Sequence, residues 1–163
     1  MLEKQVRNRH RLRKKEIQKL THELNETFSS QYELKELNID SATWGDFEIL
    51  ILKNEVFVLN YTGKFFFTIR GLLKFKPERR YVTVDMGAVK FISNGADVMA
   101  PGIVDADSDI KVGDLVWVRD ERHHQPLSIG EALMSGPEMV INKSNKAIKT
   151  IHYIGDGLWL LKL

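Results

Sequence analysis

The stretch with the clearest capacity for chemistry is residues 84–102, which read VDMGAVKFISNGADVMAPG. Asp85 precedes residues 87–92, whose apolar side chains are three residues apart, as one face of a short helix requires. Gly95 follows, and a glycine can adopt the positive φ that a helix C-terminus often needs. Small residues there would leave backbone N–H groups free. Such groups can hold a phosphate or a base edge without sequence specificity.

This pattern resembles the glycine-rich loop of the PUA domain, a small RNA-binding β-barrel. The resemblance continues in order along the chain, through KVGDLVWVRDER at residues 111–122, GEALM at 130–134 and IHYIGDGLWLLKL at 151–163. Together these segments are most similar to translation-machinery-associated proteins, related to the "multiple copies in T-cell lymphoma" protein and to ligatin. In that family a pre-PUA domain precedes the PUA domain. The resemblance is strong over residues 79–163 and looser over 1–78.

The resemblance implies a set of RNA contacts, because PUA domains commonly use this loop and its helix against RNA. The implied contacts are Lys90, Ser93, Asn94, Gly95, Ala96 and Asp97. Asp97 is the awkward member, since a carboxylate repels a phosphate. We expect it either to cap local backbone N–H groups or to accept a hydrogen bond from a base. The alternative for the whole loop is that its glycines only turn the chain.

Positive charge is concentrated at the start of the chain. Residues 1–19 carry eight lysines and arginines and two glutamates, a net charge of +6, whereas the whole chain carries only +2. Lys and Arg along one surface neutralise phosphates, although such a run is equally typical of a solvated helix face. We add Arg7, Arg11 and Lys14 to the expected RNA contacts, together with Arg79 and Arg80 near residue 76.

Patterning in the first half predicts one long helix and several strands. Four apolar residues between 17 and 28 keep helical spacing, so we predict a helix from about Leu2 to Phe28. Strands are expected over residues 46–52, 55–60 and 65–69, followed by a helical turn over 71–75. Proline and charge together at residues 76–80 indicate a boundary.

Patterning in the second half predicts many short strands with glycine turns, which suits a small barrel. We expect residues 151–163 to close it as a strand, with Trp117 and Trp159 in the core and His152 structural. The predicted fold class is therefore α+β. An α+β pre-PUA domain over residues 1–76 is followed by a small mixed β-barrel PUA domain over residues 77–163.

The sequence offers no catalytic or metal-binding pattern. There is no cysteine, hence no disulfide and no thiolate ligand, and no nucleophile elbow, phosphate-binding Walker loop or dinucleotide fingerprint occurs. Adjacent residues His123 and His124 are expected in a solvated hairpin tip without a third ligand. Asp105, Asp107 and Asp109 are expected in an acidic surface loop. We therefore predict no enzymatic activity and no metal or cofactor.

The predicted function is that of a non-enzymatic RNA-binding protein in the cytoplasm. No apolar run is long enough to span a membrane, and no apolar signal follows the charged N-terminus. The resemblance implies a translation factor at the small ribosomal subunit, which handles tRNA or rRNA in initiation or recycling. It also implies a protein partner, which in eukaryotic relatives carries an SUI1-like domain. The alternatives are an accessory subunit of a tRNA- or rRNA-modification complex and a protein–protein adaptor.

Overall fold

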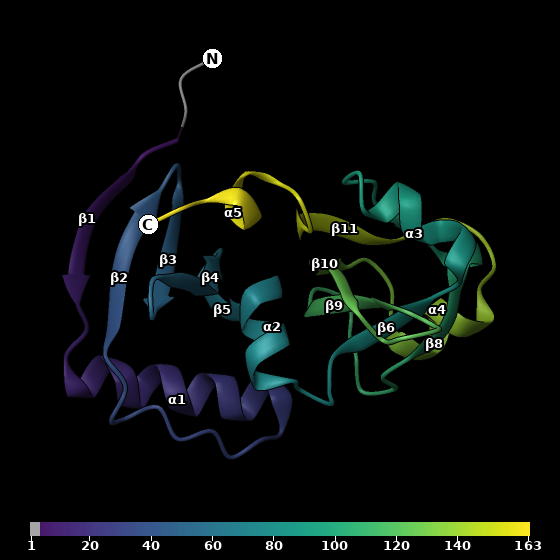
Figure 1. Cartoon of the computed structure of the whole chain (residues 1–163). Coiled ribbons are helices and arrows are strands. Elements are labelled where there is room, and N and C mark those ends of the chain that lie inside the picture. The colour runs from purple at the N-terminus through teal and green to yellow at the C-terminus, as the bar shows by residue number, and fades with distance from the viewer. Residues whose placement is uncertain (1–3) are drawn as a thin grey trace. The chain divides into compact units, whose positions relative to one another are not determined.

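The computed structural model describes residues 4–163 (Figure 1). The chain divides into two compact units. The first comprises the residues up to Lys76 together with Lys162–Leu163, and the second comprises Pro77–Leu161. The first contains a five-stranded sheet and the second a six-stranded sheet, each with helices packed against it. This confirms the predicted α+β fold class.

The first unit is built on an antiparallel sheet in the order β1-β2-β3-β4-β5. Its strands are β1 (Val6–Arg11), β2 (Ile39–Trp44), β3 (Phe47–Leu52), β4 (Glu55–Tyr61) and β5 (Lys64–Phe67), and its helices are α1 (Lys14–Phe28) and α2 (Ile69–Phe75). A two-residue turn with positive φ at Lys53 and Asn54 joins β3 to β4, as a tight hairpin requires.

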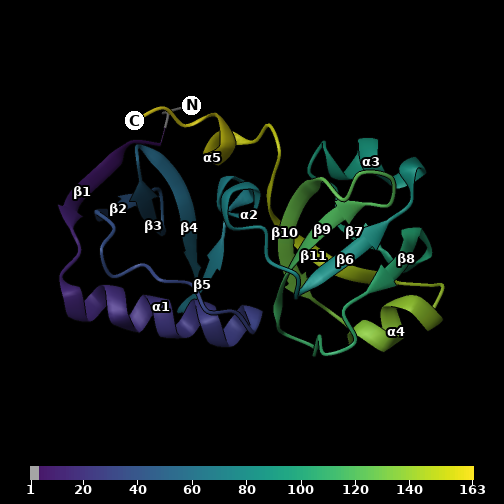
Figure 2. The same ribbon diagram turned by 60° about the horizontal axis from the view of Figure 1, so that its bottom comes forward.

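The core of this unit forms where α1 packs beside β5 (Figure 2). The helix buries one face, made of Ile17, Leu20, Leu24 and Phe28. The Phe28 ring lies 4.9 Å from the Phe66 ring and 5.0 Å from the Phe67 ring. The helical spacing of these apolar residues therefore indicated the true core face of α1.

The prediction of a helix is wrong for the first half of the N-terminal segment. Residues 6–11 form strand β1, and α1 begins only at Lys14; the predicted start at Leu2 lies outside the described residues. Strand β1 gains a backbone ladder with β2 and two side-chain bonds to Asp40, from Arg9 at 2.9 Å and Arg11 at 2.6 Å. These long-range bonds outweigh the helical propensity of a basic segment that has no apolar face to bury.

The strand predicted for residues 65–69 also ends early. Thr68 accepts a hydrogen bond from the Gly71 amide at 3.2 Å and donates one to the Val56 carbonyl at 2.6 Å. It is therefore the N-cap of α2, which begins at Ile69. The helical turn predicted from residue 71 begins two residues earlier than expected.

The second unit is a mixed sheet in the order β7-β11-β10-β9-β6-β8, in which β6 and β9 are parallel. It curls into a half-barrel, with α4 packed beside β8 (Figure 2). Its strands are β6 (Tyr81–Val84), β7 (Val98–Met99), β8 (Ile103–Ala106), β9 (Leu115–Asp120), β10 (Pro126–Ala132) and β11 (Lys146–Tyr153). Its helices are α3 (Met86–Ile92), the 3-10 turn η1 (Ala100–Gly102), α4 (Gly136–Ile141) and α5 (Gly157–Leu160).

The strand predicted for residues 151–163 ends at Tyr153. Asp156 accepts a hydrogen bond from the Trp159 amide at 2.9 Å and so caps α5. Its other carboxylate oxygen lies 2.8 Å from Nδ1 of His152, which is buried as expected. Trp159 is therefore a half-buried helix residue rather than a core strand residue, whereas Trp117 is buried.

Within residues 4–163, no helix is long and apolar enough to cross a lipid bilayer. The helices serve instead to cover the two sheets. The buried faces of β6 and β9 meet α3 and β11 in one apolar cluster that includes Val82, Val116, Ile92 and Ile148.

We expect Leu24→Ala to lower the free energy of unfolding by about 2–5 kcal/mol, because Leu24 is fully buried and its truncation leaves a cavity. The matched control is Gln18→Ala on the exposed face of the same helix, which should change stability by less than about 0.5 kcal/mol. Chemical denaturation followed by circular dichroism measures both. Equal stability of the two variants would contradict the assigned core face.

Candidate nucleic-acid interface

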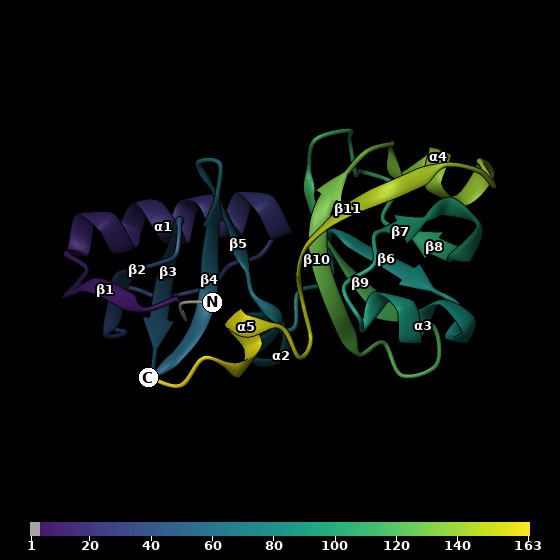
Figure 3. The same ribbon diagram turned by 90° about the horizontal axis from the view of Figure 1, so that it is seen from above.

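The first candidate surface is the exposed face of α3, on the outside of the second unit (Figure 3). The helix starts where predicted, because the Asp85 carboxylate accepts a hydrogen bond from the Ala88 amide at 2.9 Å. Buried Ile92 anchors its end. Gly87, Lys90, Phe91 and Asn94 are all exposed. The spacing of three and four residues puts Gly87, Lys90 and Phe91 on one side of the helix, and Asn94 lies in the turn that follows its end.

The loop after α3, residues 93–97, does not offer the free backbone N–H groups that the sequence suggested. The amides of Asn94 and Ala96 both donate to the Phe91 carbonyl, at 3.1 and 3.0 Å, and the Gly95 amide donates to the Ile92 carbonyl at 3.0 Å. The expectation of a phosphate cradle built from backbone groups is therefore wrong for these amides. These amides already donate to carbonyls at the end of α3, so they are not available to a phosphate.

Gly95 has two structural reasons to be glycine. Its φ is +91°, which side chains rarely allow. A Cβ at this position would lie 2.7 Å from Cε1 of Tyr153, so the tyrosine ring packs directly on the glycine. Gly95 therefore fixes the loop against β11, and replacing it would disturb the fold before it tested any RNA contact.

Asp97 ties the loop to β11. Its carboxylate lies 2.8 Å from Nζ of Lys146 and accepts a hydrogen bond from the Thr150 amide at 2.8 Å, while the Thr150 hydroxyl donates to the Ala96 carbonyl at 2.9 Å. The hydrogen bond from Lys146, and then the one from Thr150, lowers the pKa of Asp97. The carboxylate is thus ionised and paired within the protein, as a structural group that caps a backbone amide.

Two lysines that the sequence reading missed lie beside this loop. Lys146 pairs with Asp97, and the charge of Lys149 also helps to lower the pKa of Asp97. Both belong to β11, which pairs with β7 just after the loop. Their positive charge offsets Asp97 at the surface. In the sequence they are two lysines three residues apart, just before the strand predicted for residues 151–163, and strand pairing was needed to bring them to the loop.

Arg79 and Arg80 are engaged elsewhere in the second unit. Arg79 lies 3.6 Å from Asp109, and Arg80 lies 3.6 Å from Asp114 and donates to the Leu115 carbonyl at 3.2 Å. Asp107 accepts a hydrogen bond from the Arg80 amide at 2.7 Å and is buried. The expected acidic surface loop is therefore wrong for Asp107. These contacts tie both arginines to residues 107–115 rather than to the 93–97 loop.

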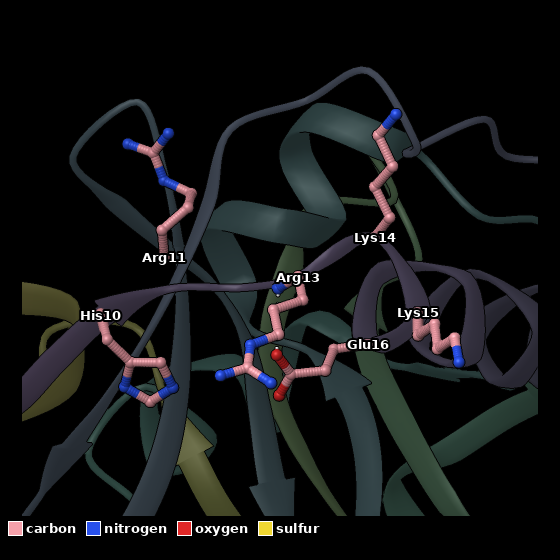
Figure 4. Close-up of a pocket in the computed structure, with 6 residues that line it drawn as sticks. All are labelled: His10, Arg11, Arg13, Lys14, Lys15 and Glu16. Atoms are coloured by element: carbon pink, nitrogen blue, oxygen red, sulfur yellow. Dashed lines mark hydrogen bonds between the residues drawn. The ribbon is translucent and has the colours of Figure 1, made fainter.

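The second candidate surface is the basic corner of the first unit, formed by β1 and the start of α1. From Arg7 onward β1 is exposed on both faces, and it is the edge strand of its sheet. Figure 4 shows the pocket at this corner, lined by His10, Arg11, Arg13, Lys14, Lys15 and Glu16. Glu16 is occupied, because its carboxylate accepts a hydrogen bond from the Arg13 amide at 3.0 Å. The remaining lining side chains are basic.

Arg11 is held in place within this basic corner by Asp40. The hydrogen bond from Arg11 is the largest cause that lowers the pKa of Asp40, and Arg9 binds the other carboxylate oxygen. Each arginine uses its Nε in this contact. Arg7 and Lys14 are exposed in the same region. The predicted contacts Arg7, Arg11 and Lys14 thus share one basic region of the first unit.

The histidines predicted in a hairpin tip are exposed there. Asp120 organises this turn by accepting hydrogen bonds from the amides of Arg122, His123 and Gln125. In the part of the chain that the structure describes, no three His, Asp or Glu side chains gather as a metal site requires.

Comparison with known proteins identifies the family. Residues 80–154 match the family model of the PUA domain. An uncharacterized protein of Methanocaldococcus jannaschii is 44% identical over 160 residues, which cover 97% of this chain and 99% of that protein. Translation machinery-associated protein 20 of Saccharomyces cerevisiae is 35% identical over 92 residues, 53% of this chain. The chain belongs to the PUA-domain family of translation machinery-associated proteins. The resemblance seen in the sequence is therefore confirmed.

The likeness extends to solved structures. A hypothetical protein from Pyrococcus horikoshii superposes with a TM-score of 0.84 at 36% identity, covering 93% of this chain and 98% of that one. The yeast relative is larger than the matched region, which spans only 51% of its length. The two archaeal proteins match nearly the whole chain and so include both units, whereas the PUA family model matches residues 80–154 of the second unit.

We expect Asp97→Asn to destabilise the protein at neutral pH, because the amide loses the ion pair with Lys146. The folded state lowers the pKa of Asp97 below its ordinary value of 3.8. The stability that the ionised carboxylate contributes is therefore complete above pH 3.8, and it is lost as the pH falls through the lowered pKa of the folded state. The two proteins should differ in unfolding free energy at about pH 7, and the difference should shrink as the pH falls below 3.8. Denaturant titrations across this range measure the difference, and a constant difference would contradict the assignment.

Proposed function

We propose that this protein is a non-enzymatic RNA-binding factor of the translation machinery. It acts in the cytoplasm at the small ribosomal subunit and handles tRNA in initiation or recycling. The observation that carries the proposal is the exposed face of α3 beside the 93–97 loop and the lysines of β11, a cationic surface with one exposed aromatic ring. Support for translation comes from the name of the yeast relative.

The chemistry of this surface suits RNA. Lys90 and Lys149 are exposed and can neutralise phosphates, while Asn94 can donate to and accept from a base or a sugar. Ser93 and Ala96 belong to the same loop. Asp97 is already paired with Lys146, and this pairing removes most of the repulsion between the carboxylate and a phosphate. We therefore keep this loop, residues 93–97, as the proposed contact with structured RNA, tRNA or rRNA.

The basic corner of the first unit is the proposed second contact. Arg7, Arg11 and Lys14 are exposed there. Among the described residues that line the pocket, Glu16 is the one acidic side chain, and its carboxylate already accepts a hydrogen bond from the Arg13 amide. Contacts of this kind fix orientation without reading sequence. Arg79 and Arg80 are weaker candidates, because acidic neighbours lie beside their terminal Nη1 atoms, whereas Arg11 bonds Asp40 through Nε. A protein partner with an SUI1-like domain belongs to the same proposal.

We expect the triple variant Arg7→Gln, Arg11→Gln and Lys14→Gln to bind all RNAs more weakly. Each lost phosphate contact should lower the slope of log K against log salt by about 0.7–0.9. Titration of a tRNA between about 50 and 200 mM salt measures the slope. The matched control is Lys35→Gln, Lys53→Gln and Lys74→Gln, which removes the same charge from exposed positions of the same unit. Equal slopes for the two triple variants would contradict a specific basic surface.

We also expect the full-length protein to sediment with purified small ribosomal subunits in a salt-dependent manner. The triple variant at the basic corner should sediment less, and the matched lysine control should behave as the wild type. If the wild-type protein binds tRNA but never sediments with the small subunit, the ribosomal part of the proposal is wrong. If it binds no RNA at any salt concentration, the whole proposal is wrong.

A further inference from the structure

Phe91 is the only exposed Phe, Tyr or Trp side chain among residues 4–163, since every other one is buried or half-buried. It is 58% exposed. One exposed apolar residue is ordinary on a protein surface, so exposure alone assigns nothing. The position of Phe91, however, is the middle of the proposed RNA surface, on the outward face of α3.

The neighbours of Phe91 on this face are not apolar. Lys90 precedes it, with Nζ 5.3 Å from the ring centroid, and Asn94 follows three residues later. Gly87 lies one turn before it and presents no side chain. A ring in cationic and polar surroundings is a poor match for an apolar protein face. It is a good match for a nucleotide, which joins a flat base to an anionic phosphate.

The ring also sits on a rigid support. The Phe91 carbonyl accepts hydrogen bonds from the amides of Asn94 and Ala96, and the next residue, Ile92, is buried in the core. Asp97 and Tyr153 hold the following loop against β11. Because the backbone is already ordered, a base that stacks on the ring costs little further entropy beyond its own.

We propose that Phe91 is a stacking platform for an unpaired nucleobase, with Lys90 on the adjoining phosphate. The proposal rests on the RNA-binding function proposed above and defines its ligand more closely. Within a duplex, neighbouring base pairs cover both faces of each base, so a side chain on a helix surface reaches a base face only at an unpaired nucleotide. The amides of residues 93–96 are already bonded, which leaves the Phe91 and Lys90 side chains as the principal recognition groups.

The test compares one RNA hairpin with a single-stranded tail and the same hairpin with a blunt end. The tail carries 2-aminopurine, whose fluorescence falls when it stacks on an aromatic ring. We expect the wild-type protein to bind the tailed hairpin more tightly and to quench the probe. Phe91→Ala should lose roughly 5- to 100-fold in affinity for the tailed hairpin, with little change for the blunt one.

Further variants separate stacking from simple apolar contact. Phe91→Tyr should retain both affinity and quenching, whereas Phe91→Leu should lose them, because a leucine keeps apolar area without a π-face. The matched control is Ile141→Ala, at an exposed apolar position of the same unit, and it should bind as the wild type does. Circular dichroism checks that each variant is folded, which the exposure of both positions favours.

The possible failures are distinguishable. If the wild type binds neither hairpin, the RNA-binding function itself is wrong and this inference falls with it. If the wild type binds both hairpins and Phe91→Ala binds them equally well, only the stacking role is overturned. If Phe91→Ala keeps RNA affinity and quenching but no longer sediments with the small subunit, Phe91 contacts a ribosomal protein. That result also overturns the stacking role.

Discussion

The Asp97 carboxylate joins parts of the second unit that are far apart in sequence. It bonds Lys146 and the amide of Thr150, which lies 53 residues further along the chain. The 93–97 loop runs from α3 to β7, and this contact ties it to β11 as well. With it, and with Tyr153 packed on Gly95, the loop is fixed at both ends. The carboxylate that looked least suitable for an RNA-binding loop is therefore what gives that loop its shape.

The local features of this region were predictable from sequence because their causes lie within a few residues. Asp85 caps α3, Ile92 anchors it, and Gly95 follows its end with positive φ. The fate of the loop amides was not predictable in the same way. The sequence suggested free groups at Gly95 and Ala96, but whether an amide after a helix end is free depends on how tightly the chain folds back on the last carbonyls.

Long-range pairing explains the other differences between sequence and structure. The backbone ladder with β2, together with the bonds from Arg9 and Arg11 to Asp40, holds the segment from Val6 to Arg11 as a strand. Lys146 and Lys149 reach the loop only because β11 pairs with β7. Phe91 is a local case instead, because its neighbour Ile92 is buried and the phase of helix α3 decides which of the two faces solvent.

The arginines of β1 also protect the exposed edge of the sheet on which they lie. An edge strand presents unpaired backbone groups that invite pairing with another chain, and charge and bulges are the usual protection. The register of β1 shifts between Arg7 and His10, where Asn8 has a φ of 56°, and every residue from Arg7 to Arg11 is exposed. The same charges that repel a second copy of this strand attract a polyanion. Protection of the sheet edge therefore accounts for the arginines on β1. It does not account for Arg13, Lys14 and Lys15, which extend the positive surface beyond the strand and into the first turn of α1. The helix dipole disfavours cations at that end of a helix. That unfavourable placement is the part of the charge pattern that an anionic partner would relieve.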